Sequence, residues 1–278
     1  MRTLRRLLWS LAVAALLGLT ACVSTWETPS PTASQAAWSV APQVQQALAP
    51  TGVLRVGVYL GSPTSLVRDA KTGQSHGVAF ELGHALGQQL GVPVHVVEYP
   101  RVAEVIEGLK KSDIDMTFTN ATSARAKEVD FTPALIQLEL GVLVPANSRI
   151  QSFADVDRAG VRLGVSQGSS SQGVLGARLK QATLVPVASL GVAQQMLQRG
   201  ELDAFATNKG ILFELAEKVP SAQVLKDRWG LENLAIAIPK GRDTAMPYLR
   251  EFAQSLVTRG ELQKMASRAG LRGLAQAD

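Results

Sequence analysis

The chain has little of what usually points to chemistry. It contains one cysteine in 278 residues, so an internal disulfide and a cysteine-ligated metal cluster are both excluded. Aromatic residues make up only 5%, and His76, His84 and His95 show no metal-binding spacing with each other or with acidic residues. We assign no Ser-His-Asp set, no paired carboxylates and no phosphate loop followed by Lys-Ser/Thr. We therefore expect neither a metal nor another cofactor.

The single cysteine, Cys22, ends a short apolar segment. Three arginines precede the uncharged run 7–19, which is too short to span a membrane comfortably. Small residues before a cysteine are typical of the lipobox of bacterial lipoproteins, in which the signal peptide is cut before the cysteine and the thiol is acylated. We therefore expect residues 1–21 to be a signal peptide and Cys22 to carry a lipid anchor. The alternative is an unprocessed cysteine in a plain signal peptide.

The segment after the cysteine has the composition of a linker. Residues 22–41 are rich in Ser, Thr, Pro, Ala and Gln with one charged residue, and this favours a flexible tether. Loss of residues 1–21 removes three of 28 basic residues and none of 23 acidic ones, so the net charge falls from +5 to +2. No basic run indicates nucleic acid. We expect a body in the periplasm, tethered to a membrane through Cys22.

Two stretches of the remaining chain occur twice in the same order. Residues 55–62 (RVGVYLGS) return as 162–169 (RLGVSQGS), and residues 109–120 (LKKSDIDMTFTN) return as 197–208 (LQRGELDAFATN). The offsets of 107 and 88 residues are too long for a solenoid repeat. The repeat predicts two similar α/β lobes, each with a loop and a strand end facing a shared cleft that the repeated polar residues line.

Apolar periodicity predicts a β-α-β-α-β run in each lobe, and hence a mostly parallel sheet flanked by helices. The expected strands are 53–59, 92–99, 114–119, 161–165, 184–187 and 202–206. The expected helices are 43–48, 81–90, 101–111, 170–179, 191–198 and 210–218.

Two extended apolar runs, 139–145 and 234–239, are predicted to cross between the lobes. They return the helices 245–258 and 261–269 to the first lobe. The expected domains are therefore 42–144 for the first part of lobe 1, 145–238 for lobe 2 and 239–278 for the C-terminal helices of lobe 1.

Four further motifs occur along the body of the chain: LRVGV at 54–58, GVAFEL at 77–82, TSARAKEVDFT at 122–132 and LAIAIPKG at 234–241. In this order they resemble the family 3 extracellular solute-binding proteins, which are periplasmic receptors of polar amino acid ABC importers. The third is similar to the family signature Thr-x-x-Arg-x-x-x-Val-Asp-Phe-Ser. The resemblance implies a two-lobed type II periplasmic-binding-protein fold with two hinge crossings. It further implies a monomer that is not an enzyme and that delivers a small solute to an ABC permease in the inner membrane.

Arg125 is the first residue to which the resemblance gives a role, as the group that holds the ligand's carboxylate. A guanidinium offers two parallel donors that match the two oxygens of a carboxylate, and it stays charged. Thr122 suits the N-cap of the helix that Arg125 opens. The alternative is a solvated arginine in a first helical turn.

The run Gly168-Ser169-Ser170-Ser171 lies where a predicted strand leads into a predicted helix. Free N–H groups and the helix dipole favour an anion there, so Ser169 and Ser170 are candidate ligand contacts. Simple helix capping by serine is the alternative. Ser62 is the repeat counterpart of Ser169. The resemblance implies an aromatic residue near the start of the second helix, where this chain has Val102, and Tyr59 and Tyr99 are the candidates to replace it. We expect Ser62 and Tyr59 at the ligand.

Asn120 and Asn208 are the repeated pair. The resemblance implies Asp at 208 for an α-ammonium group, and an amide cannot neutralise that charge. We therefore expect a site that keeps its anion-binding half and loses its cation-binding half. Its ligand would be a carboxylate-bearing solute without a standard zwitterionic head, or a neutral polar solute. In the alternative, a glutamate elsewhere in the chain supplies the charge, with Glu98, Glu139 and Glu214 as candidates.

Three function classes follow. The first is a lipid-anchored receptor of an ABC importer, which closes around its solute. The second is a dehydratase-type enzyme on the same scaffold, which needs a general acid with a shifted pKa in the cleft, and for which Glu98 and Glu139 are candidates. The third is a sensor or accessory lipoprotein that passes its signal to a partner. The sequence does not name the ligand.

Overall fold

The computed structural model describes residues 40–275. The expected signal peptide 1–21, the lipid site Cys22 and nearly all of the expected tether lie outside the described residues and stay predictions. Within residues 40–275, no helix is both long enough and apolar enough to span a bilayer. No cluster of His, Cys, Asp or Glu in the same range is arranged to hold a metal ion.

The first lobe follows the predicted β-α-β-α-β order. Its elements are α1 (Pro42–Leu48), β1 (Leu54–Tyr59), β2 (Val67–Arg68), β3 (Ser75–His76), α2 (Val78–Leu90), β4 (Val94–Tyr99), α3 (Val102–Lys110), β5 (Thr117–Asn120), α4 (Ser123–Ala126) and β6 (Val129–Phe131). Strands β1 and β4 pair in parallel along their full lengths. A parallel bridge between Val56 and Met116 joins β1 to the segment that enters β5. The first repeat unit therefore builds a parallel sheet, as expected.

The second lobe repeats this order. Its elements are η1 (Phe153–Asp155), β8 (Arg162–Ser166), α5 (Ser170–Arg178), β9 (Thr183–Val187), α6 (Leu190–Gln198), β10 (Ala204–Asn208), α7 (Lys209–Lys218) and β11 (Gln223–Val224). Strand β8 lies between β9 and β10 and is parallel to both. The short strands β2, β3, β6 and β11 were not predicted, because segments of two or three residues show no periodicity. The single-turn helix α4 is the one that Thr122 was expected to cap.

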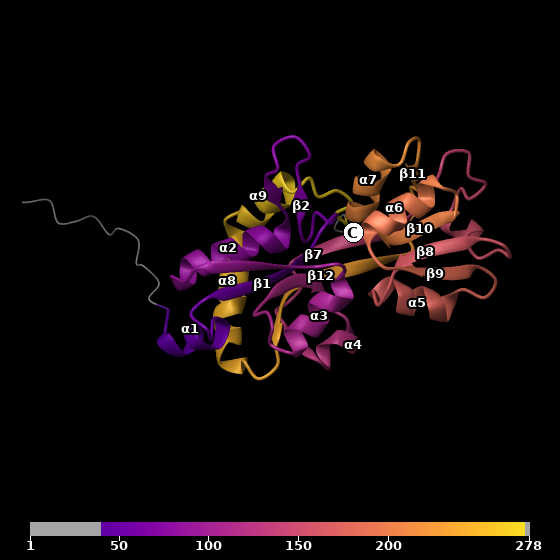
Figure 1. Ribbon diagram of the computed structural model, residues 1–278. Helices are drawn as coiled ribbons and strands as arrows, with labels where there is room; N and C mark the ends of the chain where they lie inside the picture. The colour runs from indigo at the N-terminus through magenta and orange to yellow at the C-terminus, as the bar shows by residue number, and fades with distance from the viewer. Residues whose placement is uncertain (1–39, 276–278) are drawn as a thin grey trace, which may run out of the picture. The chain divides into compact units, whose positions relative to one another are not determined.

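Two long strands connect the lobes (Figure 1). Strand β7 (Ile136–Val144) and strand β12 (Gly230–Pro239) are antiparallel partners over 136–140 and 230–234. Beyond that overlap, β7 pairs with β10 of the second lobe and β12 pairs with β5 and β6 of the first. The sheet order β5-β12-β7-β10-β8-β9 is therefore continuous. Pairing partners change near residues 140 and 234, a few residues before the domain limits expected at 144 and 238.

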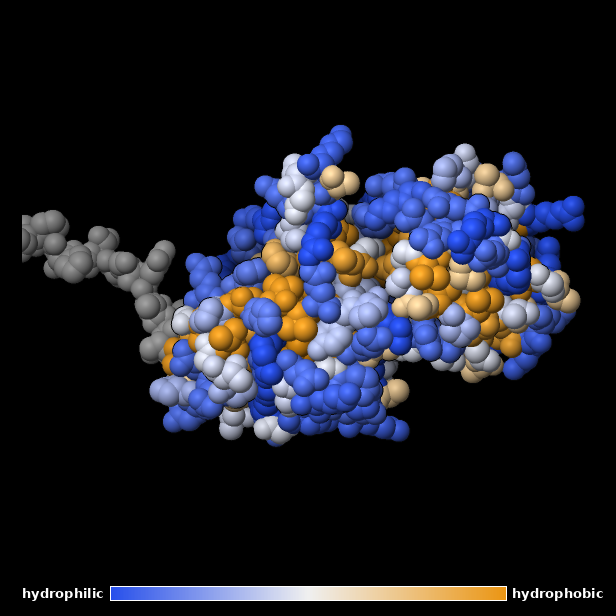
Figure 2. All heavy atoms as spheres, in the orientation of Figure 1, coloured by the Kyte–Doolittle hydropathy of each residue, from blue (hydrophilic) through white to orange (hydrophobic). Residues whose placement is uncertain are grey.

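The C-terminal helices α8 (Met246–Thr258) and α9 (Glu261–Arg268) follow the 3-10 turn η2 (Asp243–Ala245) and pack on the first lobe. Their apolar faces share a buried cluster with α1, α2 and β1. Separate clusters fill the second lobe beneath α5, α6 and α7. On the face shown in Figure 2, hydrophobic residues are visible over both lobes among hydrophilic ones.

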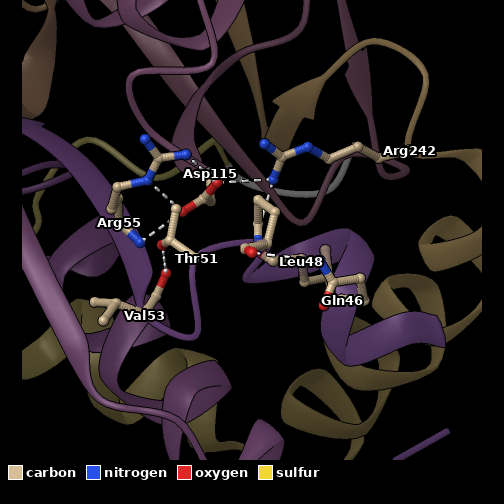
Figure 3. Close-up of polar contacts among 8 residues, drawn as sticks. Gln46, Leu48, Thr51, Val53, Arg55, Asp115 and Arg242 are labelled. Atoms are coloured by element: carbon tan, nitrogen blue, oxygen red, sulfur yellow. Dashed lines mark hydrogen bonds and ion pairs between the residues drawn. The ribbon is translucent and has the colours of Figure 1, made fainter. Parts of the chain in front are cut away.

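In each lobe, an arginine of the first repeated motif pairs with an aspartate of the second. In lobe 1, Asp115 is fully buried and accepts hydrogen bonds from the backbone N–H of Arg55 at 2.9 Å and from its Nε and Nη2 at 2.9 and 2.8 Å (Figure 3). Nη1 of Arg242, just after β12, donates to the same carboxylate at 2.9 Å. In lobe 2, Arg162 contacts Asp203 through the same three groups at 2.8 to 2.9 Å. The repeated residues therefore tie the first strand of each lobe to its third.

Candidate ligand-binding site

A cavity between the two lobes collects most of the residues that the sequence selected. We call it the interlobe cavity; its interior volume is about 30 Å³, and it opens to solvent. Six of the seven expected ligand contacts line it: Tyr59, Asn120, Arg125, Ser169, Ser170 and Asn208. The other lining residues that matter below are Thr64, Arg101, Thr119, Ser171, Thr207 and Glu232.

Arg125 reaches the interlobe cavity from the single turn α4. The hydroxyl of Thr122 caps this turn by accepting from the backbone N–H of Arg125 at 3.2 Å, as the sequence predicted. The guanidinium is held by Nη1, which donates to Oγ1 of Thr119 at 3.0 Å and to the carbonyl of Asn120 at 3.2 Å. Its Nε and Nη2 have no acceptor among the described residues. Two N–H groups on one edge of a guanidinium match the geometry of the two oxygens of a carboxylate.

The second lobe contributes the N-terminus of α5. Ser169 is its N-cap, because its Oγ accepts from the backbone N–H of Gln172 at 3.2 Å, so the capping alternative holds for this serine. The backbone N–H groups of Ser170 and Ser171 find no acceptor within residues 40–275. Unpaired N–H groups at a helix N-terminus favour an anion. Donors from both lobes therefore line the same cavity.

Asn120 connects the lobes directly. Its Nδ2 donates to Oγ of Ser170 at 3.2 Å, and its Oδ1 accepts from the backbone N–H of Asn233 on β12 at 2.9 Å. Tyr59 also lies between the lobes, since it packs against buried clusters of both. Burial raises the pKa of the Tyr59 phenol, whose hydroxyl is near those of Ser62 and Thr64. At neutral pH this side chain is therefore an uncharged wall of the cavity.

Ser62 is the expected contact that does not line the interlobe cavity. It is fully buried, and its hydroxyl shares a 2.8 Å hydrogen bond with that of Thr64. The loop after β1 folds back on itself through the bridges of Leu66 to Leu60 and to Ser62, which brings Thr64 to the cavity instead. The repeat relation to Ser169 therefore does not extend to the position of the side chain.

A carboxyl group that the sequence did not single out, that of Glu232, lies beside Asn208, where the cation-binding half was expected to be lost. Glu232 lies on β12, is 8% exposed and lines the interlobe cavity. Its Oε2 accepts a hydrogen bond from Nδ2 of Asn208 at 3.0 Å. None of the three glutamates named from the sequence lines the cavity. Each forms an ion pair elsewhere: Glu98 with Arg68, Glu139 with Lys209 and Arg228, and Glu214 with Lys218.

The cavity is therefore lined by both an acidic and a basic side chain, Glu232 and Arg125. Burial raises the pKa of Glu232, while the hydrogen bond from Asn208 and the attraction of Arg125 oppose that rise. Burial lowers the pKa of Arg125, and the attraction of Glu232 opposes the fall. An arginine keeps its charge at neutral pH even so. Arg101, paired with Glu104 at 2.7 Å, adds a second cation to the lining that the sequence did not single out.

Two α/β lobes joined by two strands, with a polar cavity between them, define the ligand-binding class of type II periplasmic binding proteins. Solved structures agree with this fold. The ancestral amino acid-binding protein AncCDT-1, a precursor of cyclohexadienyl dehydratase, superposes with a TM-score of 0.71 at 25% identity, covering 81% of this chain and 98% of that one. An amino acid ABC transporter substrate-binding protein from Streptococcus pneumoniae, solved with L-arginine, gives 0.73 at 20% identity, with coverage of 81% and 97%.

Sequence comparison gives the family. Residues 54–270 match the model of bacterial extracellular solute-binding proteins, family 3, and the chain therefore belongs to that family. A glutamine-binding protein of Geobacillus stearothermophilus is 24% identical over 249 residues, which cover 85% of this chain and 95% of the relative. The resemblance drawn from four short motifs is confirmed, and so is the fold that it implied.

Proposed function

We propose that this protein is a lipid-anchored, extracytoplasmic receptor of an ABC importer, and that it captures a small carboxylate-bearing solute in the interlobe cavity. The observation that carries the proposal is the position of Arg125. Its Nε and Nη2 edge is free at a cavity that the unpaired N–H groups of Ser170 and Ser171 also line. The relatives' names, which include a glutamine-binding protein and an amino acid ABC transporter component, support this class of solute.

Capture would work by a shift of population between open and closed arrangements of the lobes. A carboxylate at Arg125 and at the N-terminus of α5 contacts both lobes at once, so it stabilises the closed arrangement more than the open one. Among the described residues, strands β7 and β12 are the two segments in which the chain runs from one lobe to the other. They are the elements about which such a movement would turn.

The solute proposal is tested by titration calorimetry of the full chain with small carboxylates and amino acids. Arg125→Ala should weaken binding of any carboxylate-bearing solute by more than about tenfold, because a charge-assisted bidentate pair is lost. Arg199→Ala is the matched control, since Arg199 is exposed, pairs with Glu201 and lies away from the interlobe cavity. Equal affinities of the wild type and the Arg125→Ala variant would remove the carboxylate from this position.

The membrane anchor is a separate part of the proposal and depends on Cys22 alone. Metabolic labelling with a radioactive fatty acid should mark the wild-type chain and leave Cys22→Ser unlabelled. In cell fractionation the substituted chain should leave the membrane fraction. A membrane-bound Cys22→Ser chain without label would instead indicate another mode of attachment.

A second candidate function rests on Glu232. A dehydratase-type enzyme on this scaffold needs a general acid in the cleft, and a buried carboxyl with a raised pKa meets that requirement better than Glu98 or Glu139, which lie elsewhere. Nuclear magnetic resonance of a bound solute over many hours separates the two candidates. An unchanged solute favours the receptor, whereas loss of water from the solute would establish the enzyme.

A further inference from the structure

We propose that Glu232 binds a positively charged amine of the solute, and that Asn208 is a positioning residue which holds the Glu232 carboxylate. This inference rests on the proposed function, because it concerns the other half of the cavity that holds the carboxylate. It assigns the counter-ion to the strand β12 rather than to the end of β10, where the family resemblance led us to expect it.

Only one oxygen of the Glu232 carboxylate has a hydrogen-bond partner among the described residues. Oε2 accepts the 3.0 Å hydrogen bond from Asn208, and Oε1 accepts none from the residues that the structure describes. No cation among residues 40–275 is within ion-pair distance, and Arg125 attracts the carboxylate only from further away. A buried carboxylate without a cationic partner is costly. The side chain nevertheless lines the interlobe cavity at 8% exposure, so a donor in the cavity can complete it.

Asn208 is already committed to the fold. Its Oδ1 accepts from the backbone N–H of Ile211 at 3.0 Å and so caps α7, which fixes the orientation of the amide. Its Nδ2 must then face outward from the helix, and it donates to Glu232. The residue therefore presents a donor, not an acceptor, toward the cavity side, and an ammonium group finds no acceptor there. The acceptor for an ammonium group lies one hydrogen bond further on, at Glu232.

Arg125 and Glu232 line the same cavity and suit solute groups of opposite charge. A carboxylate at Arg125 and an ammonium at Glu232 would neutralise both buried charges at once. A solute that carries only the carboxylate would leave Glu232 to stay protonated or to bear an unpaired charge. This arrangement selects an amino acid or a closely related amino-carboxylate as the solute. Glu232 would distinguish that solute from an analogue that lacks the amine.

This role couples binding to protonation. Burial favours the protonated carboxyl in the free protein, and an ammonium requires the ionised one, so binding an amine should release a proton. The other ionisable groups that line the cavity are Arg125, Arg101 and the phenol of Tyr59. The arginines keep their charge at and below neutral pH, and the pKa of Tyr59 is raised, so Glu232 is the group that titrates there.

The experiment uses the full chain. The twenty proteinogenic L-amino acids are screened by thermal shift, and the tightest binder is compared in calorimetry with its analogue in which hydrogen replaces the α-amine. The wild type should prefer the amine by more than about tenfold. Glu232→Gln should lose more than about tenfold in affinity for the amine and little for the analogue. Glu98→Gln, an exposed carboxylate outside the cavity, is the control.

The pH dependence gives a readout that a purely structural role would not change. In the wild type, affinity for the amine should rise with pH and proton release should accompany binding, and both effects should be absent in Glu232→Gln. An equal loss for amine and analogue would mean that Glu232 only shapes the cavity, and would overturn the inference while leaving carboxylate capture intact. Failure of all twenty amino acids, and of the small carboxylates titrated above, to bind the wild type would overturn the proposed function itself, and the inference with it.

Discussion

The two lobes carry the same arginine–aspartate pair but bury it to different depths. Asp115 of lobe 1 is 0% exposed and serves two arginines, whereas Asp203 of lobe 2 is 36% exposed and serves one. The extra partner is Arg242, which follows β12 at the point where the chain has returned to lobe 1. The described residues show no second arginine that returns to Asp203 in this way, because the chain between β7 and β12 builds lobe 2 in one stretch. The difference between the pairs therefore follows from the topology.

The repeated asparagines have diverged in a similar way. Asn120 and Asn208 both end the third strand of their lobe, and both reach neighbouring residues of β12. Asn120 accepts from the backbone N–H of Asn233 and contacts Ser170 across the cavity. Asn208 caps a helix and holds the carboxylate of Glu232. One copy thus joins the lobes, and the other positions a charge.

The largest difference that we expect between the lobes is in stability. Asp115→Asn should lower the free energy of unfolding by about 3–5 kcal/mol, because it leaves the buried Arg242 and the partly buried Arg55 without a charged partner. Asp203→Asn should cost about 1 kcal/mol or less, because its pair is exposed to solvent. Urea unfolding of the two variants measures both. Equal losses would show that burial does not separate the two pairs.

The next largest effect concerns Asn208, where the family resemblance led us to expect an aspartate. Asn208→Asp would place a second carboxylate about 3 Å from that of Glu232, and like charges so close cannot both ionise freely. We expect a loss of about 1–3 kcal/mol at neutral pH, which shrinks as the pH falls and the pair takes up a proton.

The double variant Asn208→Asp/Glu232→Gln is the control for that substitution. It exchanges the acid and the amide, so the glutamine can donate to the new aspartate, and both stability and affinity for an amine should recover in part. Thermal unfolding with and without the tightest-binding amino acid measures the recovery. A double variant as unstable as Asn208→Asp would contradict the repulsion argument.

A smaller effect should follow Glu232→Gln in the solute-free protein. Because burial raises the pKa of Glu232 above its ordinary value, the folded state holds the proton more tightly than the unfolded chain. That stability is fully present below the unfolded pKa, near 4.5, and is lost as the pH rises through the folded pKa.

The variant should therefore match the wild type near pH 4 and exceed it at pH 7, by about 1 kcal/mol. Unfolding temperatures across this pH range measure the gap. A gap that closes as the pH rises would contradict the direction of the pKa change.

The smallest expected effects separate two adjacent serines. Ser169→Ala removes the cap of α5 and should cost about 1 kcal/mol of stability. Ser170→Ala removes the 3.2 Å contact with Asn120 between the lobes and should change stability by about 0.5 kcal/mol or less. Its effect should instead appear in small-angle scattering, as a more open solute-free protein. Identical behaviour of the two variants would mean that Ser170 does not help to close the lobes.

The sequence predicted most helices and strands because apolar periodicity marks each of them, and the repeat pointed to the cleft. The sequence did not identify Glu232 as a site residue, and the reason is physical. The apolar run of β12 begins at Leu234, so the polar residues before it carried no strand signal, although β12 starts at Gly230. The contact of Glu232 with Asn208 joins residues that are 24 positions apart through sheet pairing, which no local pattern encodes. The sequence also did not reveal that the side chain of Ser62 lies away from the cavity, because its position depends on the course of a loop.

The most direct test of a solute gripped from both sides is a crystal structure of the protein grown with the amino acid that it binds most tightly. Our account predicts the carboxylate at Nε and Nη2 of Arg125 and at the N–H groups of Ser170 and Ser171, with the amine within about 3.2 Å of Glu232. A solute that contacts one lobe alone, or that lies outside the interlobe cavity, would contradict it.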